Sequence, residues 1–459
     1  MPKKIDRREF MKVAGVAGAA LATGAMAMDD KPQLTKRAPK GATSVAGLAT
    51  PKLDKVRVGF IGVGERGSGH VVQMMAIDGV EVKAICDIHG PSAEASRARV
   101  VKKGLPEPAM YGKDEHDYKR MLERDDIDIV LIATPWNWHV PMAVDAMKAG
   151  KHAFVEVPAS PTLEGCWELV DTSEVTQKHC MMMENVNYGR EELMVLNMCR
   201  LGVFGELLHG EAAYIHDLRY QMNDIEVGTG KWRTYQYATR NGNLYPTHGL
   251  GPVAQYMNIN RGDRMDYMSS VSSPSRSRAL YAQAHFPEGH ERRSIKFVCG
   301  DINTSIVKTV MGKTIMIQWD EQLPRPYSRL NLIQGTKGVW GGFPDRVTIE
   351  GTTKNTEEWT DGDGLQQFYD KYDHPLWKRV GEEAKKMGGH GGMDFVMLWR
   401  IVYCLRNGLP LDQDVYDAAS WSVIGPLSEW SVKNRSQSID IPDFTRGKWK
   451  TMEPLGIVS

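Results

Sequence analysis

A short apolar segment that ends in a glycine motif constrains the fold of this chain most strongly. Residues 56–61 (VRVGFI) are typical of a buried strand, and the following residues 62–67 (GVGERG) form the pattern Gly-x-Gly-x-x-Gly. In this pattern Gly62 permits a tight turn, Gly64 lets the backbone approach a pyrophosphate, and Gly67 lets the next helix pack against the strand. The free N–H groups of that helix then face the phosphates. The motif predicts a dinucleotide site; a glycine-rich turn without a ligand is the alternative.

The acidic residue that follows the second predicted strand supports the same prediction. Residues 80–86 have the pattern of a strand, and Asp87 follows it 23 residues after Gly64. A carboxylate in this place accepts hydrogen bonds from both ribose hydroxyls and repels a 2′-phosphate, so Asp87 favours NAD over NADP. A simple helix or turn cap is the alternative role for this side chain.

Strand and helix patterns alternate from residue 56 to about residue 188, which predicts a parallel sheet with crossover helices. After Gly205 most of the patterns are of strands, and helices return near the carboxyl end. We therefore predict an α/β chain with an N-terminal Rossmann dinucleotide-binding domain and an α+β C-terminal domain with an open, largely antiparallel sheet. The predicted strands are residues 56–61, 80–86, 127–133, 152–155 and 181–184 in the first sheet, and 207–215, 267–272, 294–299, 302–311, 313–319, 329–334 and 346–349 in the second.

Length and composition argue for more than one domain and against several kinds of binding site. A chain of 459 residues is too long for one simple core, and its 57 basic and 57 acidic residues balance. This balance predicts neither nucleic-acid binding nor a polybasic membrane surface. The six cysteines form no Cys-x-x-Cys pair, so no metal site or disulfide framework is predicted.

The N-terminus has the pattern of an export signal. Arg7 and Arg8 form a twin-arginine pair, residues 13–27 are modestly apolar, and Ala25-Met26-Ala27 fits a cleavage site. The apolar run is too short to span a membrane stably. We expect a periplasmic or secreted protein without a membrane span after processing. The predicted organisation is a signal peptide at 1–27, a linker at 28–54, the NAD-binding domain at 55–188 and a substrate-binding domain at 189–459.

Polar and aromatic residues follow three further strands of the predicted parallel sheet, at the edge where ligands bind. They are Trp136-Asn137-Trp138-His139, Glu156-Val157-Pro158 and Glu184-Asn185. Dehydrogenases of this architecture commonly carry Glu-Lys-Pro in place of Glu156-Val157-Pro158, and the lysine transfers a proton. Val157 cannot do so, and either another residue supplies the base or the reaction differs from simple alcohol oxidation.

The second half of the chain supplies candidate proton-transfer groups. Tyr245-Pro246-Thr247-His248-Gly249 predicts the start of a helix, and Tyr245 and His248 are a plausible acid/base pair near pH 7. A core or surface imidazole is the alternative for His248. His390 lies between two glycine pairs, which suits a catalytic loop or an anion-binding turn. Three further residues have hydrogen-bonding groups for a sugar-like ligand, although structural roles stay open for each: Tyr214, Arg233 and Tyr327.

Several of these motifs together resemble glycosyl hydrolase family 109, the NAD-dependent α-N-acetylgalactosaminidases, within the Gfo/Idh/MocA oxidoreductase superfamily. The resemblance covers about residues 55–450, and its motifs are residues 64–67, 136–139, 156–159, 184–186, 245–252 and 389–392. It implies NAD contacts at Glu65, Arg66, Asp87, Trp136, Asn137, Trp138, His139, Glu156, Val157, Asn185 and Tyr245. It implies sugar contacts at Tyr214, Arg233, Tyr245, Pro246, Thr247, His248 and Tyr327.

The resemblance also implies an activity. Terminal α-N-acetylgalactosamine is oxidised at carbon 3, the aglycone is eliminated, water is added and the sugar is reduced again, so NAD stays bound and no net redox occurs. Tyr245 and His248 would act on the sugar, and His390 is our choice of general acid. Family relatives suggest that the open sheet buries a partner subunit, which makes a homo-oligomer an expectation.

Two other functions remain as alternatives. An exported sugar oxidoreductase similar to glucose–fructose oxidoreductase also uses the twin-arginine route, but Asp87 and Val157 argue against its NADP and its lysine. A non-catalytic nucleotide-binding protein would have no need for Tyr245, His248 and His390 together.

Overall fold

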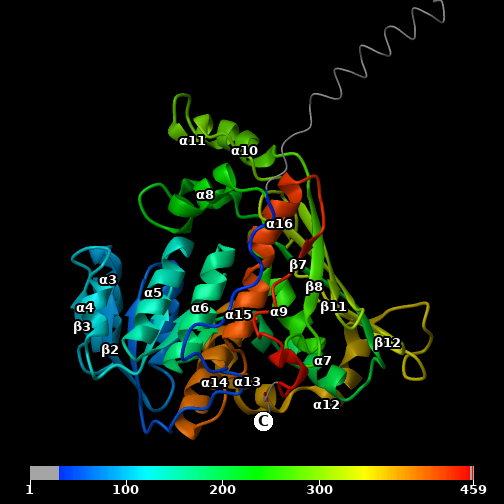
Figure 1. The fold of residues 1–459 in the computed structure, drawn as a ribbon, viewed down its shortest axis with the longest axis horizontal. Coiled ribbons are helices and arrows are strands. Elements are labelled where there is room, and N and C mark those ends of the chain that lie inside the picture. The colour runs from blue at the N-terminus through cyan, green and yellow to red at the C-terminus, as the bar shows by residue number, and fades with distance from the viewer. Residues whose placement is uncertain (1–29, 455–456, 458–459) are drawn as a thin grey trace, which may run out of the picture. The chain divides into compact units, whose positions relative to one another are not determined.

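The computed structural model describes residues 30–454 and 457, and the chain from Gln33 onward forms one compact unit. The predicted signal peptide at 1–27 lies outside the described residues. Two sheets form the framework of this unit, with helices packed on both (Figure 1). Within residues 30–454 and 457, none of the helices combines the length and the apolarity that crossing a membrane requires.

The first sheet has six parallel strands in the order β3-β2-β1-β4-β5-β6, which confirms the predicted parallel sheet. Its central strands β4 and β5 are buried throughout, because helices cover both faces of a parallel sheet. The strands are β1 (Val56–Ile61), β2 (Val80–Cys86), β3 (Ala109–Tyr111), β4 (Ile129–Ile132), β5 (His152–Val155) and β6 (Cys180–Met182). The edge strand β3 was not predicted, since its three residues are too few to carry a pattern.

The strand order reverses between β1 and β4, which pair through Ile61 and Ile132. The chain leaves β1 in one direction and β4 in the other, so a crevice opens at their carboxyl ends. The helices of this sheet are α2 (Glu65–Met74), α3 (Gly90–Lys102), α4 (Tyr118–Leu122), α5 (Trp136–Lys148) and α6 (Leu163–Thr176).

Helix α5 begins at Trp136, the first residue of the Trp136–His139 motif. Pro135 has the extended dihedral angles φ −56° and ψ 146°, and the helix starts directly after it. Its carbonyl oxygen accepts a hydrogen bond from the Trp138 N–H at 2.8 Å. The tryptophans therefore lie in the first turn of a helix rather than in a loop.

The second sheet has nine strands in the order β14-β13-β12-β11-β7-β10-β9-β8-β15. Among the described strands of this second sheet only β7 and β10 pair in parallel, which confirms the predicted, largely antiparallel sheet. The strands are β7 (Leu207–Ile215), β8 (Met265–Ser272), β9 (Asn303–Thr309), β10 (Thr314–Asp320), β11 (Leu332–Gly335), β12 (Gly338–Gly341), β13 (Arg346–Ile349), β14 (Thr360–Asp361) and β15 (Ile439–Asp440).

The predicted strand at residues 294–299 is wrong. A short helix, α11 (Glu291–Ser294), covers its start, and the N–H groups of Val298 and Cys299 both donate to the Tyr237 carbonyl oxygen. This carbonyl lies in α8 (Thr229–Thr239), a helix that was not predicted. The Tyr237 carbonyl oxygen thus accepts the two N–H groups that would bond a neighbouring strand if this segment belonged to a sheet.

The helices near the carboxyl end join the two sheets. Helix α15 packs on α6 and β6 of the first sheet, and α16 packs on β8 of the second, as the orange and red ribbons of Figure 1 show. Helix α14 contacts α2, and α9 packs on β7. The remaining helices are η1 (Asn185–Tyr188), α7 (Arg190–Arg200), η2 (Arg219–Asn223), α9 (Thr247–Tyr256), α10 (Ser277–His285), η3 (Gly362–Leu365), α12 (Gln366–Tyr372), α13 (Pro375–Met387), η4 (His390–Gly392), α14 (Met393–Asn407), α15 (Val415–Ser422), α16 (Ile424–Lys433) and η5 (Lys448–Lys450).

Residues 33–54, within the predicted linker, have no helix or strand but pack on the rest of the unit. Val45 is buried, and its N–H donates to the Tyr416 hydroxyl at 3.1 Å. The Thr43 N–H donates to the Glu174 carbonyl oxygen at 3.1 Å. This segment therefore lies along α6 and α15.

The close approach of α2 to β1 gives a test of the fold. A Cβ atom on Gly67 would lie far inside the van der Waals distance of the Gly62 carbonyl oxygen. We expect Gly67→Ala to lower the free energy of unfolding by about 1–3 kcal/mol, as overpacking does. Gly69→Ala is the control, because a Cβ there meets nothing within 4 Å and alanine stabilises a helix interior by about 0.5–1 kcal/mol. Urea unfolding measures both, and equal stability of the two variants would contradict the predicted packing.

Candidate functional site

A cleft of about 1010 Å³ opens at the crevice between β1 and β4 and continues to the second sheet. This volume lies at the upper end of the range for small-molecule sites, about 300–1,000 Å³. Most of the residues predicted to bind cofactor or sugar line it: Gly62, Gly64, Glu65, Arg66, Asp87, Trp136, Trp138, His139, Glu156, Val157, Asn185, Tyr214, Arg233, Tyr245, His248 and His390. The predicted residues outside its lining are Gly67, Asn137, Pro246, Thr247 and Tyr327.

The glycine loop has the geometry that a pyrophosphate requires. Gly62 has φ +81°, and a Cβ there would lie 2.6 Å from the Ala133 carbonyl oxygen. Gly64 faces the cleft, and a Cβ there would meet nothing within 4 Å. The backbone at the start of α2 is thus open to an anion in the cleft.

Asp87 acts as a turn cap and also faces the cleft. Its Oδ2 accepts the Val63 N–H at 2.7 Å, and its Oδ1 accepts the His89 N–H at 2.8 Å. Each carboxylate oxygen has a second acceptor site, so these bonds leave room for the two hydroxyls of a ribose. The cap and the predicted cofactor contact are compatible.

An aromatic wall with one buried cation forms the side of the cleft towards the second sheet. The rings of Trp136 and Tyr245 are stacked with centroids 5.9 Å apart. The Arg233 guanidinium carbon lies 4.5 Å from the Tyr245 ring centroid and 4.9 Å from that of Trp136. Glu321 accepts a hydrogen bond from Arg233 Nη2 at 2.8 Å. Burial lowers the pKa of Arg233, but the charge of Glu321 and the surrounding tyrosines together raise it more, so the guanidinium remains charged.

Two buried tyrosines of this wall remain protonated at neutral pH. Burial raises the pKa of Tyr245 well above its ordinary value, and the Arg233 charge opposes this effect only in part. Burial raises the pKa of Tyr214 in the same way. The Tyr214 hydroxyl lies 3.1 Å from His216 Nδ1. Both tyrosines can therefore donate hydrogen bonds into the cleft.

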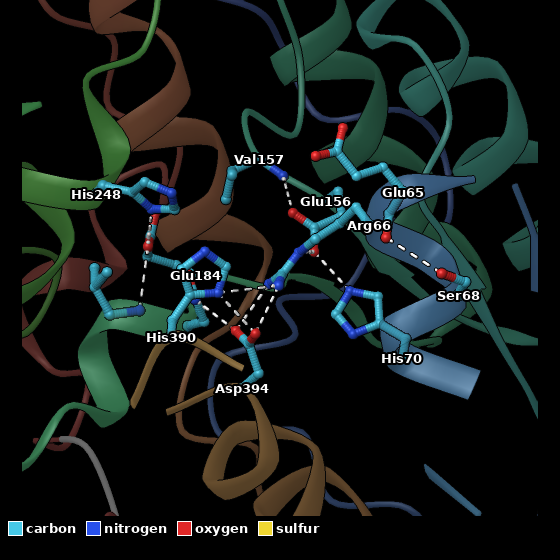
Figure 2. Close-up of polar contacts among 12 residues, drawn as sticks. Glu65, Arg66, Ser68, His70, Glu156, Val157, Glu184, His248, His390 and Asp394 are labelled. Carbon is cyan, nitrogen blue, oxygen red and sulfur yellow. Dashed lines mark hydrogen bonds and ion pairs between the residues drawn. The ribbon is translucent and has the colours of Figure 1, made fainter. Parts of the chain in front are cut away.

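His248 lies at the start of α9 and pairs with a buried carboxylate. Its Nδ1 lies 2.6 Å from Oε1 of Glu184, a residue that is 0% exposed (Figure 2). Rings of Tyr214 and Tyr245 lie at centroid distances of 5.1 and 5.0 Å from the imidazole. The His248 ring is thus held between an anion and two hydrogen-bond donors.

A network of charged side chains forms the floor of the cleft (Figure 2). Arg66 donates from Nε to Glu156 at 2.7 Å, and from Nη1 and Nη2 to Asp394 at 2.7 and 3.0 Å. His70 Nε2 lies 2.7 Å from the same Glu156 oxygen. His390 Nδ1 lies 2.8 Å from Asp394. The network thereby joins the glycine-motif helix to the loop that carries His390.

Electrostatics keeps both carboxylates of the network charged. Burial alone would raise the pKa of Glu156, but the Arg66 charge and the hydrogen bond with His70 hold it far below its ordinary value. Burial also opposes the charge on Asp394, whereas Arg66 and His390 lower its pKa more strongly. One guanidinium balances two buried anions, and breaking such a group leaves an uncompensated charge.

Some predicted site residues have roles that the sequence did not reveal. Each nitrogen of the Arg66 guanidinium bonds a carboxylate, so this side chain organises Glu156 and Asp394. The His139 ring is buried, with its nitrogens 2.7 and 2.8 Å from the carbonyl oxygens of Pro158 and Thr134, and braces the turn. Tyr327 lies outside the cleft lining, behind Tyr214 and His216. Its ring centroid lies 6.1 Å from that of Tyr214 and 5.1 Å from that of His216.

Sequence reasoning missed residues that share the cleft. Asp394 follows His390 by four positions at the start of α14, a spacing that places the two side chains together on one face. His216 follows Tyr214 by two positions at the end of β7, a spacing that puts two strand residues on one face. Both signals were present. Nothing in the sequence pointed to His70 or Glu321, which lie far along the chain from their partners.

Comparisons with known proteins agree with this geometry. Residues 56–184 match the model of the oxidoreductase family with an NAD-binding Rossmann fold, and residues 188–451 match that of the glycosyl hydrolase 109 C-terminal domain. A glycosyl hydrolase family 109 protein of Shewanella putrefaciens is 62% identical over 456 residues, and one of Shewanella baltica is 61% identical over 456 residues, with 99% of each chain covered. A solved levoglucosan dehydrogenase in complex with NADH and levoglucosan is 18% identical and has a TM-score of 0.65, with 85% of this chain and 100% of that chain covered. At this identity the likeness shows the fold.

NAD is thus the cofactor of this chain, and the residues present fit it. The open backbone at Gly64 suits the pyrophosphate, and Asp87 suits the adenosine ribose. The remainder of the cleft, towards Tyr245 and His248, provides the space for a second ligand.

The ion pairs of Arg66 with Glu156 and Asp394 predict how the stability of an Arg66→Met variant depends on pH. Arg66→Met leaves Glu156 and Asp394 buried without their cation, and we expect it to lower the free energy of unfolding at pH 7 by about 3–5 kcal/mol. Without Arg66, burial is opposed only by His70 at Glu156 and by His390 at Asp394, and we expect both carboxyl pKa values to rise above those of the unfolded chain, about 4. A carboxyl group whose pKa is raised in the folded state stabilises the fold at low pH, and this stabilisation is lost as the pH rises. The variant should therefore become more stable when the pH is lowered from 7 to 5.

Urea unfolding at pH 7 and pH 5 measures this effect. Arg57→Met is the matched control, because Arg57 pairs with Asp128 but is 37% exposed. We expect this control to lose at most about 1 kcal/mol. A loss no larger in Arg66→Met than in Arg57→Met would show that the network does not stabilise the fold.

Proposed function

Because the chain belongs to glycosyl hydrolase family 109, we propose that it removes terminal α-N-acetylgalactosamine from glycans through a redox cycle without net oxidation. The observation that carries this proposal is the composition of the single described cleft. It joins the NAD-binding loop to several proton-transfer groups, Tyr245, His248 and His390. A dehydrogenase needs one base for one hydroxyl; an elimination needs groups for several proton transfers.

The proposed cycle divides between cofactor and side chains. NAD, when bound, supplies the acceptor for the hydride of sugar carbon 3 and the donor that returns it. The side chains move the protons: one leaves the carbon-3 hydroxyl, one leaves carbon 2, and one joins the departing glycosidic oxygen at carbon 1. Water then adds at carbon 1, carbon 2 regains a proton, and the carbon-3 oxygen regains its proton when the hydride returns. Atoms and electrons balance as in a hydrolysis.

Tyr245 and His248 are the groups we assign to carbons 3 and 2. The protonated Tyr245 hydroxyl donates a hydrogen bond to the carbon-3 oxygen, which stabilises negative charge as it develops there. The carbon-3 ketone makes the neighbouring carbon-2 proton acidic. The imidazole of His248 is suited to remove this proton.

His390 and Arg233 complete the proposed site. His390 is 59% exposed at its side chain and lies on the cleft lining, where it can protonate the leaving oxygen. Arg233 Nε is buried and has no hydrogen-bond partner among the described residues, so it can donate to a sugar hydroxyl. Such a site needs no pair of glycosidase carboxylates on either side of the scissile bond.

A cleavage assay tests the proposal. Purified protein with its bound NAD should release p-nitrophenol from p-nitrophenyl α-N-acetylgalactosaminide over many turnovers without accumulating NADH. His248→Ala and His390→Ala should each lower kcat by about 10²–10⁴-fold and keep NAD bound. His209→Ala is the control, because His209 bonds Thr314 outside the cleft lining. Net NADH formation from a free sugar without cleavage would instead identify a sugar oxidoreductase.

Export is a second part of the proposal. We propose that Arg7 and Arg8 direct the chain to the twin-arginine route, and that NAD binds before export because this route carries folded proteins. Replacing both by lysine should retain the protein in the cytoplasm, as cell fractionation measures. Arg37→Lys is the control and should leave export unchanged. Equal export of the double variant and the wild-type chain would contradict the proposed route.

A further inference from the structure

Glu184 lies beyond the end of β6 and is held in place by the backbone. Its N–H donates to the Met182 carbonyl oxygen at 2.9 Å, and its own carbonyl oxygen accepts Gln413 Nε2 at 3.2 Å. The residue is 0% exposed. The backbone of Glu184 is therefore held by hydrogen bonds, and its side chain has no access to bulk water.

The Glu184 carboxylate has one ionisable partner among the ion pairs of residues 30–454 and 457, and this partner is His248. Oε1 lies 2.6 Å from His248 Nδ1 and also accepts the Val186 N–H at 3.4 Å (Figure 2). Oε2 is buried and has no hydrogen-bond partner among the described residues. A buried carboxylate is costly unless it is hydrogen-bonded, and His248 is the side chain that bonds this one.

This contact fixes which nitrogen of His248 is available. An ionised carboxylate only accepts hydrogen bonds, so Nδ1 of His248 must carry the proton and donate it. Nε2 of the neutral ring is then the proton acceptor, and His248 lines the cleft. When the ring takes a second proton, the adjacent carboxylate stabilises the resulting imidazolium.

Two glycines of α9 hold this helix in the place that the contact requires. A Cβ on Gly251 would lie 2.9 Å from Glu184 Cγ and 2.8 Å from Asn187 Oδ1. A Cβ on Gly249 would overlap the Ala213 backbone of β7. Helix α9 thus fits between η1 and β7 only with glycine at these positions, and His248 near its N-terminus is brought onto Glu184.

We propose that Glu184 is the positioning residue of His248: it sets the Nδ1–H tautomer, presents Nε2 to the substrate, and balances the imidazolium formed in turnover. The proposal rests on the proposed function, in which His248 is the base. The other groups around the imidazole are Tyr214 of β7, His216 directly after β7 and Tyr245 before α9. Glu184 is the carboxylate bonded to the imidazole.

The test compares Glu184→Gln with the wild-type, NAD-loaded enzyme. Glutamine has the same shape but can donate or accept, so it no longer dictates the tautomer. We expect kcat to fall by about 10²–10⁴-fold with KM and bound NAD unchanged, as in other carboxylate–histidine pairs. Glu184→Asp keeps the charge and should recover part of the lost kcat. Wild-type kcat in Glu184→Gln would overturn the proposal.

A spectroscopic measurement separates this proposal from the proposed function. In protein labelled with ¹⁵N-histidine, the wild-type His248 ring should give the signals of the Nδ1–H form, and Glu184→Gln should shift them. This readout does not need turnover, so it holds even if the chain cleaves no N-acetylgalactosaminide. Unchanged His248 signals in Glu184→Gln would show that Glu184 does not set the tautomer.

Two further variants control for folding. Glu174→Gln removes another buried carboxylate, one that bonds the Tyr416 hydroxyl and Arg446 outside the cleft lining, and it should keep wild-type kcat and His248 signals. If Glu184→Gln does not fold, Gly251→Ala displaces the Glu184 side chain without removing its charge. We expect this variant to lose kcat and to shift the His248 signals. Retention of both would overturn the proposal.

Discussion

The ion pairs of Arg66 are the interaction on which the rest of the site depends. Arg66 comes from the glycine motif, Glu156 from the end of β5, and Asp394 from the start of α14, so one guanidinium joins segments 328 residues apart. Burying the two carboxylates is costly, and this cost is offset because each nitrogen of the guanidinium has a carboxylate partner. The consequence is geometric: the cofactor loop and the loop of His390 cannot shift independently.

The site contains two histidines that each contact a carboxylate through Nδ1. Glu184 bonds His248, and Asp394 bonds His390. Asn185, directly after Glu184, donates from Nδ2 to Asp394 at 2.6 Å. Of these two consecutive residues, Glu184 therefore bonds His248 directly, and Asn185 bonds the carboxylate that contacts His390. In the proposed cycle this arrangement separates the tasks. The first sheet holds the cofactor, and the carboxylates orient the groups that move protons.

The sequence predicted those parts of the fold in which local pattern and burial agree. Strands β1, β2, β5, β7 and β13 have the predicted bounds, because their apolar residues face the core throughout or in alternation. The segment at 294–299 has the same local pattern but bonds to the end of α8, a tertiary contact that no local pattern contains.

The same limit applies to the site. Motifs placed Tyr245, His248 and His390 on the list of candidates, and the structure brings them to one cleft. The spacing of four positions could have indicated Asp394 as the partner of His390, whereas Glu321, the partner of Arg233, lies 88 positions away and could not be assigned from the sequence. Arg66 shows the converse: the family resemblance implied an NAD contact, whereas its side chain pairs with two carboxylates that only the fold brings near.

The central claim is that the hydride removed from the sugar returns to it in the same turnover. A substrate that carries deuterium at carbons 2 and 3 tests this claim most directly in ordinary water, with the released N-acetylgalactosamine examined by NMR and mass spectrometry. The account predicts that the deuterium remains at carbon 3 of the product while carbon 2 acquires a solvent hydrogen. Released sugar that retains its deuterium at carbon 2 would contradict it, because no elimination would then have occurred.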